Sequence, residues 1–199
     1  MRTIDAYYPD WRNLIMHESS PIDRGASRRL SQECHHYIPS QFFPDQQPGS
    51  MTGGYRCENL EALTFEDESV DLHITQDVLE HVFHPAEVFK EIARTLKPGG
   101  AHIFTVPLIN QSNPSRVRAQ AGTDGRITHL QPPIYHSNPV SAEGSLVTVD
   151  WGFDICRHIH EACGLFTHRV CFDDVSQGLR AEYLDVLITT KPKPGHDTF

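Results

Sequence analysis

The segment from residue 70 to residue 107 constrains the fold more than any other part of the chain. Apolar and polar residues alternate from Val70 to Thr75, which is typical of a β-strand. In the following HPAEVFKEIARTLKPGG, apolar side chains recur on one face of a helix that starts at Pro85, and the Pro-Gly-Gly of residues 98–100 ends it. AHIFTVP then resumes as an apolar strand. The order strand, helix, strand predicts an α/β fold.

Repetition of this unit implies a parallel sheet with crossover helices, in which ligands bind beyond the carboxyl ends of the strands. LIMH, HHYI, YRC and DLHIT are the further segments that we expect to be strands or parts of strands. The polar residues that follow them are therefore the first candidates for a binding site. They are Glu18, Ser19 and Ser20, then Ser40 and Gln41, then Glu58 and Asn59, then Gln76 and Asp77.

Composition limits the partners of the chain. Its 199 residues, 38% of them hydrophobic, predict one globular domain. The 26 acidic and 17 basic residues give a net charge of −9, which argues against nucleic acid or an anionic membrane as the main partner. No long apolar run or signal-peptide core is present, so we expect a cytoplasmic protein. Five scattered cysteines suit free thiols.

A longer segment carries a family resemblance. ENLEALTFEDESVDLHITQDVLEHVFHPAEVFKEIARTLKPGGAHIFTVP resembles the central part of class I S-adenosylmethionine-dependent methyltransferases of the type 11 group. The matching elements are Asn59, Leu63-Thr64-Phe65, the acidic turn 66–69, Val70-Asp71, Leu79-Glu80-His81 and Leu96-Lys97-Pro98-Gly99-Gly100. The chain departs from the family pattern at Thr64, where proline is usual, and at Val70, where phenylalanine is usual.

The resemblance implies a Rossmann-like methyltransferase fold: a mainly parallel seven-stranded sheet with helices on both faces and an antiparallel last strand near residues 183–190. It implies a single domain over residues 1–190, with residues 109–150 as a substrate-side insertion and residues 191–199 as a loose tail. It also implies S-adenosyl-L-methionine as cofactor and a small-molecule or glycan-type methyl acceptor. Nucleic acid and membrane partners are not expected, and a homodimer is possible.

In the family, the first strand ends in an acidic residue and a glycine-rich turn. The aligned residues here are Glu18, Ser19, Ser20, Pro21 and Gly25, so the turn is poor in glycine. Serine hydroxyls can still bond to the carboxylate or ammonium of the cofactor, which predicts an altered binding turn. The alternative is that Glu18, Ser19 and Ser20 only cap the following helix.

Further cofactor contacts are expected at the other strand ends. Ser40 and Gln41 stand where the family usually places a carboxylate for the ribose, and Phe42 could face the adenine or belong to the core. Glu58 or Asn59 would border the adenine. The remaining residues assigned to the cofactor are Leu60, Gln76, Asp77 and His81.

Methyl transfer needs an aligned nucleophile and, for some acceptors, a base, so catalytic candidates follow from position alone. Asp77 and His81 come just after the fourth expected strand, and His136 lies in the long segment after the fifth. With 13 histidines in the chain, a structural or solvated role is the alternative for each one. The long segment also has arginines that could hold a polar acceptor, or it could be a surface excursion.

One spacing is compatible with a metal. Cys156, His160 and Cys163 recur on one side of a predicted helix. An apolar stripe explains the two cysteines better, and no fourth ligand lies nearby, so we expect no metal. Two function classes remain: a methyltransferase, and an inactive cofactor-binding or partner-binding module on the same fold.

Overall fold

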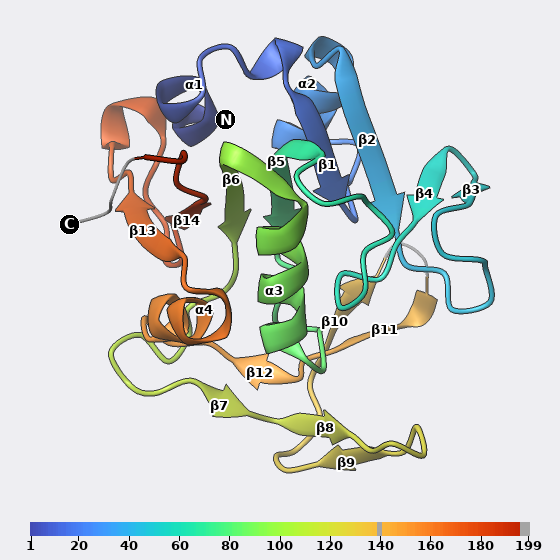
Figure 1. Cartoon of the computed structure of the whole chain (residues 1–199). Coiled ribbons are helices and arrows are strands. Elements are labelled where there is room, and N and C mark those ends of the chain that lie inside the picture. Colours follow the sequence, from blue (N-terminus) through green and yellow to red (C-terminus); the bar gives the residue numbers. More distant parts are fainter. Residues whose placement is uncertain (139–140, 196–199) are drawn as a thin grey trace.

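The computed structural model describes residues 1–138 and 141–195 (Figure 1). The helices are α1 (Arg2–Tyr7), η1 (Trp11–Asn13), α2 (Gly25–Glu33), α3 (Pro85–Thr95), α4 (Ile155–Cys163) and η2 (Val175–Gln177). The strands of the main sheet are β1 (Ile15–Ser19), β2 (His36–Gln41), β3 (Met51–Thr52), β4 (Tyr55–Cys57), β5 (Val70–Gln76), β6 (Leu96–Thr105), β13 (Phe166–Cys171) and β14 (Asp185–Thr190).

The main sheet has the order β13-β14-β6-β5-β1-β2-β4-β3. Pairing is parallel from β6 through β5, β1 and β2 to β4, and β14 runs antiparallel to both of its neighbours. The mainly parallel sheet and the antiparallel last strand are therefore confirmed. The expected strand count of seven is wrong by one, because the short β3 folds back on β4 and adds an eighth strand.

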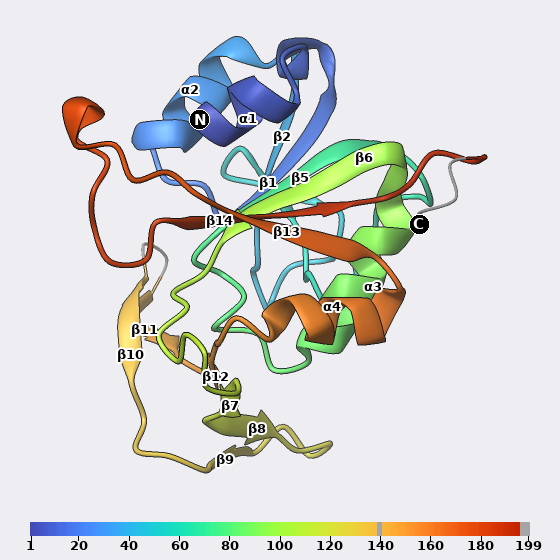
Figure 2. The same ribbon diagram turned by 90° about the vertical axis from the view of Figure 1, so that its left-hand side faces the viewer.

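Helices cover both faces of the sheet, as expected (Figures 1 and 2). One hydrophobic cluster packs under α1 and α2 and includes Ile4, Trp11 and Leu30. The other packs under α3 and α4 and includes Phe89 and Ile159. No helix in residues 1–138 and 141–195 is long and apolar enough to span a membrane.

The helix α3 ends earlier than the sequence predicts. It runs from Pro85 to Thr95, and β6 already begins at Leu96 rather than at Ala101. Leu96 has an extended backbone, and the residue before Pro98 is disfavoured in a helix, so the chain leaves the helix ahead of the proline. Gly99 has a positive φ of 86°, a conformation that favours glycine, and its N–H donates to the carbonyl of Lys191 at 2.8 Å.

Three histidines lie in one row across the middle of the sheet. His17 of β1 pairs in register with His73 of β5, which pairs with His102 of β6. All three are buried, and the Nδ1 atoms of His17 and His73 lie 2.8 Å apart. Burial lowers the pKa of His17 and of His102 to about 3, and lowers the pKa of His73 well below its ordinary value. The row is therefore neutral. Its side-chain hydrogen bonds outside the row are with the hydroxyls of Ser40, Thr95 and Thr75.

The segment 109–150 lies below the carboxyl ends of the central strands (Figures 1 and 2). It contains β7 (Arg116–Val117), β8 (Ala119–Ala121), β9 (Ile127–His129), β10 (Tyr135–Asn138), β11 (Ser141–Leu146) and β12 (Val149–Asp150), paired in three two-stranded sheets. The segment is anchored where it returns to the domain, because the backbone N–H of Thr148 donates to the carbonyl of Glu80 at 2.7 Å. Buried Arg118 and Asp150 form an ion pair of 2.7 Å near the same end.

Residues 191–195 follow β14, and residues 196–199 lie outside the described part of the chain. Lys191 is tied to the domain, since its Nζ donates to the carbonyl of Ala93 and its N–H to that of Gly100.

Candidate functional site

Glu18 is a strand residue and not part of a loop, since β1 extends to Ser19. The carboxylate is fully buried and accepts three hydrogen bonds from the protein. Ser27 Oγ and Gln76 Nε2 donate to Oε1 at 2.6 and 2.7 Å, and Tyr37 Oη donates to Oε2 at 2.7 Å. Burial raises the pKa of Glu18, and the three donors oppose that rise. Glu18 thus links β1, α2, β2 and β5 through hydrogen bonds.

The turn after β1 keeps a conformation that favours glycine, although serine occupies it. Ser20 has a φ of 55°, and its N–H donates to the carbonyl of Ser40 at 2.8 Å. Gly25 opens α2 with a φ of 57°, and a Cβ added there would meet no other atom within 4 Å. The residue at the N-cap of α2 is Arg24, and no side chain caps the helix. The alternative that Glu18, Ser19 and Ser20 cap α2 is therefore wrong.

The end of β2 divides between buried and accessible side chains. Ser40 is fully buried, and its hydroxyl lies 2.7 Å from His17 Nε2. Gln41, the last residue of β2, is half-buried. Phe42 is 52% exposed, so it is not a core residue. Of the residues predicted at this strand end, Gln41 and Phe42 are the ones that a ligand can reach.

The residues after β4 show the same division. Glu58 is buried, receives a bond from Arg56 Nε at 2.5 Å, and accepts from the N–H and the hydroxyl of Thr64. Asn59 is half-buried, and its Oδ1 accepts the N–H of Glu61 at 3.0 Å. Leu60 belongs to the hydrophobic core. Asn59 is the residue of this group with an accessible polar side chain.

At the end of β5, the Gln76 side chain points inward, whereas Asp77, the next residue, is exposed. The amide of Gln76 donates to Glu18 and to Ser27. Asp77 is exposed, has a φ of 52°, and accepts one bond of 3.1 Å from the hydroxyl of Thr105. A negative charge therefore stands at the carboxyl edge of the sheet.

Glu80, His81 and His136 form a cluster that the sequence predicts only in part. His81 and His136 were both proposed as catalytic candidates, and their ring centroids lie 5.1 Å apart in an edge-on arrangement. Between them is Glu80, whose Oε1 is 3.7 Å from His81 Nε2 and 3.8 Å from His136 Nδ1. Sequence reasoning used the Leu-Glu-His motif only to recognise the family, so Glu80 was missed.

The protonation states in this cluster follow from burial. Burial raises the pKa of Glu80 to about 8, and the charge of Asp77 adds to that rise. Burial also lowers the pKa of His81, so its imidazole is neutral near pH 7. His81 Nδ1 lies 2.9 Å from the carbonyl oxygen of Leu146. Because a carbonyl can only accept, Nδ1 carries the proton and Nε2 keeps a free lone pair.

The helix α4 does not gather its cysteines and histidine into a metal site. His160 is exposed and stacks on Phe166, while the thiol of Cys163 donates to the carbonyl of Ile159. Among the described residues, the one group of three side chains able to share a metal ion is Glu80, His81 and His136.

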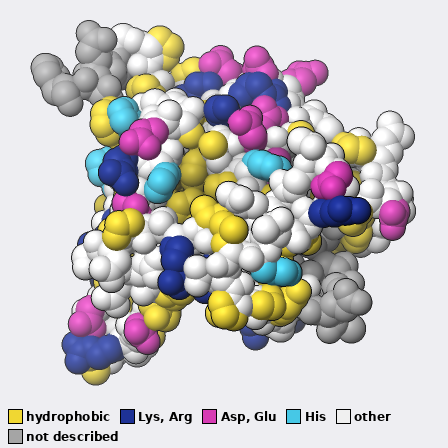
Figure 3. Space-filling model, turned by 90° about the horizontal axis from the view of Figure 1, so that it is seen from below, with side chains coloured by type: hydrophobic (Ala, Val, Ile, Leu, Met, Phe, Trp, Pro, Cys, Tyr) yellow, Lys and Arg dark blue, Asp and Glu magenta, His cyan; other side chains and the backbone are white. Residues whose placement is uncertain are grey.

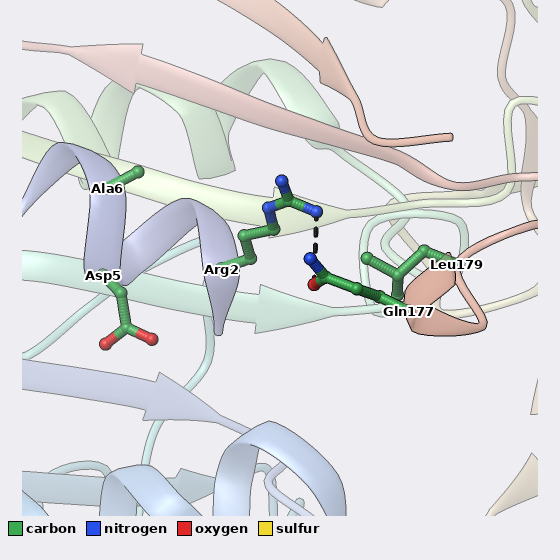
Figure 4. A pocket seen from close by; sticks show the side chains of 5 residues that line it. All are labelled: Arg2, Asp5, Ala6, Gln177 and Leu179. Atoms are coloured by element: carbon green, nitrogen blue, oxygen red, sulfur yellow. Dashed lines mark hydrogen bonds between the residues drawn. The ribbon is translucent and has the colours of Figure 1, made fainter. Parts of the chain in front are cut away.

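One hollow lies beside the ends of β5 and β6, and a second lies away from this edge. A cavity of about 60 Å³ beside Ala26, Gln76 and Thr105 is far below the size of a cofactor pocket. A groove of about 510 Å³ lies between α1 and η2, where Arg2 reaches across to Gln177 (Figure 4). Seen from below, the side chains of the insertion face mix acidic, basic, histidine and hydrophobic types, without one dominant charged patch (Figure 3).

Comparison with known proteins agrees with this geometry. Residues 32–104, from the end of α2 to β6, match the family model described as a methyltransferase domain. This part of the chain therefore resembles a methyltransferase domain. It is 33% identical over 72 residues to malonyl-[acyl-carrier protein] O-methyltransferase of Marinomonas sp., which is 36% of this chain and 26% of that protein. It is 40% identical over 50 residues to dimethylglycine N-methyltransferase of Parasynechococcus marenigrum, which is 25% and 18% of the two lengths.

The chain thus spans about a quarter or less of these curated relatives, with 26% and 18% of their lengths covered. Solved structures show the same fold over nearly the whole chain. A methyltransferase from Mesorhizobium loti superposes with a TM-score of 0.58 at 14% identity and covers 95% of both chains. The [4+2]-cyclase SpnF superposes with a TM-score of 0.53 at 14% identity, over 96% of this chain and 80% of that chain.

Proposed function

We propose that the chain is an S-adenosylmethionine-dependent methyltransferase that acts on a small-molecule or sugar-containing acceptor. The observation that carries the proposal is the match of residues 32–104 to a methyltransferase domain. This segment supplies β2, β4, β5 and β6, whose carboxyl ends border the accessible polar residues Gln41, Asn59 and Asp77. Ligands of parallel α/β sheets bind at that edge.

The chemistry of these donors fits the cofactor. The carboxamides of Gln41 and Asn59 can accept from ribose hydroxyls or bond to the adenine edge, and the exposed Phe42 can stack on the base. The carboxylate of Asp77 and the hydroxyl of half-buried Ser20 suit the ammonium and carboxylate of the methionine part, whereas Ser19 is buried. The cofactor, when bound, supplies an activated methyl group. In this arrangement Glu18 supports the site through Gln76 without touching the cofactor.

Acceptor chemistry is assigned to the Glu80–His81–His136 cluster. His81 has a neutral imidazole whose Nε2 lone pair can take the proton of an acceptor hydroxyl or amine. His136 is partly exposed, which lets it orient a polar acceptor from the side of the insertion. The insertion excludes water from beneath, since Val147 and Thr148 are buried against the loop after β5.

Calorimetric titration with S-adenosylhomocysteine tests the cofactor assignment. Wild-type protein should bind one equivalent, and Asn59→Trp should weaken that affinity at least tenfold because the indole would fill space beside the adenine. Asn13→Trp, at an exposed position on the short helix before β1, is the matched control and should bind as wild type does. Equal affinity in the two variants would remove Asn59 from the site.

Methyl transfer itself is tested with labelled cofactor and a panel of hydroxyl and amine acceptors. His81→Gln should lower turnover at least a hundredfold while leaving the affinity for S-adenosylhomocysteine unchanged. A protein that binds S-adenosylhomocysteine and transfers no methyl group would favour the second candidate, a binding module. Glu18 and Glu58 favour that candidate, because both carboxylates are buried and already accept hydrogen bonds from protein donors, so neither is free to bind a ligand.

A further inference from the structure

We propose that Glu80, His81 and His136 form a binding site for one divalent transition-metal ion of the Zn²⁺ class. The inference deepens the proposed function, on which the catalytic meaning of the site rests, but the binding of the ion requires neither cofactor nor acceptor.

The three donor atoms already surround a common point. All of them lie within 4.8 Å of one another, and the two nitrogens lie 3.7 and 3.8 Å from the same oxygen, Glu80 Oε1. In a tetrahedral zinc site with bonds near 2.1 Å, neighbouring ligand atoms are about 3.4 Å apart. The two nitrogen–oxygen distances are therefore only about 0.3 and 0.4 Å longer than in such a site.

Glu80 supplies an independent indication of a missing partner. Its side chain is 3% exposed, and neither carboxylate oxygen has a hydrogen-bond partner among the described residues. No lysine or arginine of the described chain forms an ion pair with it. A buried carboxylate without a partner is costly, and coordination to a cation removes that cost.

His81 is oriented as a metal ligand would be, with one ring nitrogen toward Glu80 and the other bonded to the carbonyl of Leu146. Its Nδ1–H donates to the carbonyl of Leu146 at 2.9 Å, which fixes the tautomer and directs the Nε2 lone pair toward Glu80. Metal-bound histidines typically donate their second ring N–H to a carbonyl or carboxylate in this way. The contact bridges the loop after β5 and the end of β11.

The backbone around the cluster is held from two sides. Thr148 donates its N–H to the carbonyl of Glu80 and its hydroxyl to the carbonyls of Glu80 and Val82. Trp151 Nε1 donates to the carbonyl of Leu79. Ligands held by rigid neighbours lose little freedom on binding an ion, which favours a preformed site.

The donor set selects the kind of ion. Two imidazoles and one carboxylate suit Zn²⁺ and related transition ions, whereas Mg²⁺ and Ca²⁺ prefer oxygen ligands. Three protein ligands leave a position open, and the 43% exposure of the His136 side chain provides access to it. In the metal-bound form His81 would be a ligand, and an acceptor hydroxyl at the open position would lose its proton to water more readily; in the metal-free form His81 remains the base.

The test uses the full chain, stripped with a chelator, and titrated with ZnCl₂ alone by calorimetry. CoCl₂ provides a second readout, because its visible absorption reports bound nitrogen ligands and a low coordination number. Wild type is expected to bind one equivalent. Glu80→Gln and His136→Asn should each weaken binding at least tenfold and abolish the cobalt spectrum.

His84→Gln is the matched control, since His84 and Glu61 form a histidine–carboxylate pair of 2.7 Å that no third metal-binding side chain joins among the described residues. It should bind Zn²⁺ as wild type does. Equal affinity in Glu80→Gln, or no stoichiometric binding by folded wild type, overturns the proposal. Either result leaves the binding of S-adenosylhomocysteine and the proposed function untouched, because the titration contains no cofactor.

Discussion

The buried histidine row should make the domain sensitive to acid. His17, His73 and His102 are held neutral in the folded state, but each regains an ordinary pKa near 6.5 when the chain unfolds. Protonation of both partners in the His17 and His73 pair would also place two N–H groups against each other at 2.8 Å. The unfolded state therefore binds more protons, and the free energy of unfolding falls as the pH falls below about 6.5.

The magnitude follows from linkage. A histidine with an unfolded pKa of 6.5 and a folded pKa of about 3 costs about 2 kcal/mol of stability at pH 5. His17 and His102 together cost about 4 kcal/mol, and the lowered pKa of buried His73 adds to that loss, which is large beside the entire stability of many domains. Carboxyl groups with raised pKa values, Glu80 above all, oppose part of this loss over the same range.

His102→Leu isolates one member of the row. The variant removes the histidine that lies 2.9 Å from the hydroxyl of Thr75, a loss that is the same at every pH. It also removes one of the protons that the wild-type chain takes up when it unfolds in acid. Relative to wild type, its free energy of unfolding should rise by about 2 kcal/mol between pH 7 and pH 5.

Urea denaturation at both pH values measures this difference, with the fluorescence of buried Trp11 and Trp151 reporting on the two cores. Exposed His168 provides the control, and His168→Gln should behave as wild type at both pH values. If wild type and His102→Leu lose equal stability between pH 7 and pH 5, His102 accepts a proton inside the fold and the reasoning fails.

Two further changes test the carboxyl groups. In metal-free protein, Glu80→Gln should raise the free energy of unfolding by about 3–5 kcal/mol at pH 8.5, because the raised pKa of Glu80 makes its ionised form unfavourable in the fold. Urea denaturation should show that this gain in stability disappears toward pH 4.5. A difference between the variant and wild type that stays constant with pH would contradict the prediction. Glu18→Ala should lower the free energy of unfolding by about 2–4 kcal/mol, because Ser27, Tyr37 and Gln76 would each lose the carboxylate to which they donate. Its affinity for S-adenosylhomocysteine should change less than about tenfold, and a larger change measured by calorimetry would show that Glu18 contacts the cofactor.

The fold was predictable because its evidence is local. The alternation at Val70 to Thr75 and the apolar face behind Pro85 are readable without knowledge of distant residues, and β5 and α3 formed at those places. The eighth strand was not predictable from the sequence, since β3 has only two residues and is defined by its pairing with Tyr55 and Arg56 of β4. Strand alternation also gave no sign that His73 is buried, because both faces of this sheet are covered.

The candidate site was predictable in position but not in orientation. Successive side chains of a strand point to opposite faces, so two neighbouring polar residues at a strand end have opposite surroundings. Ser40 is buried against His17 while Gln41 remains accessible, and Gln76 turns toward Glu18 while Asp77 is exposed. A shift of one residue in the predicted strand end exchanges these roles, and sequence patterns locate strand ends less accurately than that.

The Glu80 cluster depends on a contact between segments far apart in the chain. Thr148 and Leu146 return from the insertion and bond to the carbonyl of Glu80 and to His81. The same return brings His136 to the carboxylate. The segment after β6 therefore takes part in building this cluster. It completes a cluster of one carboxylate and two imidazoles whose first two members are supplied by the loop after β5, so changes in the insertion and in that loop should act on the same chemistry.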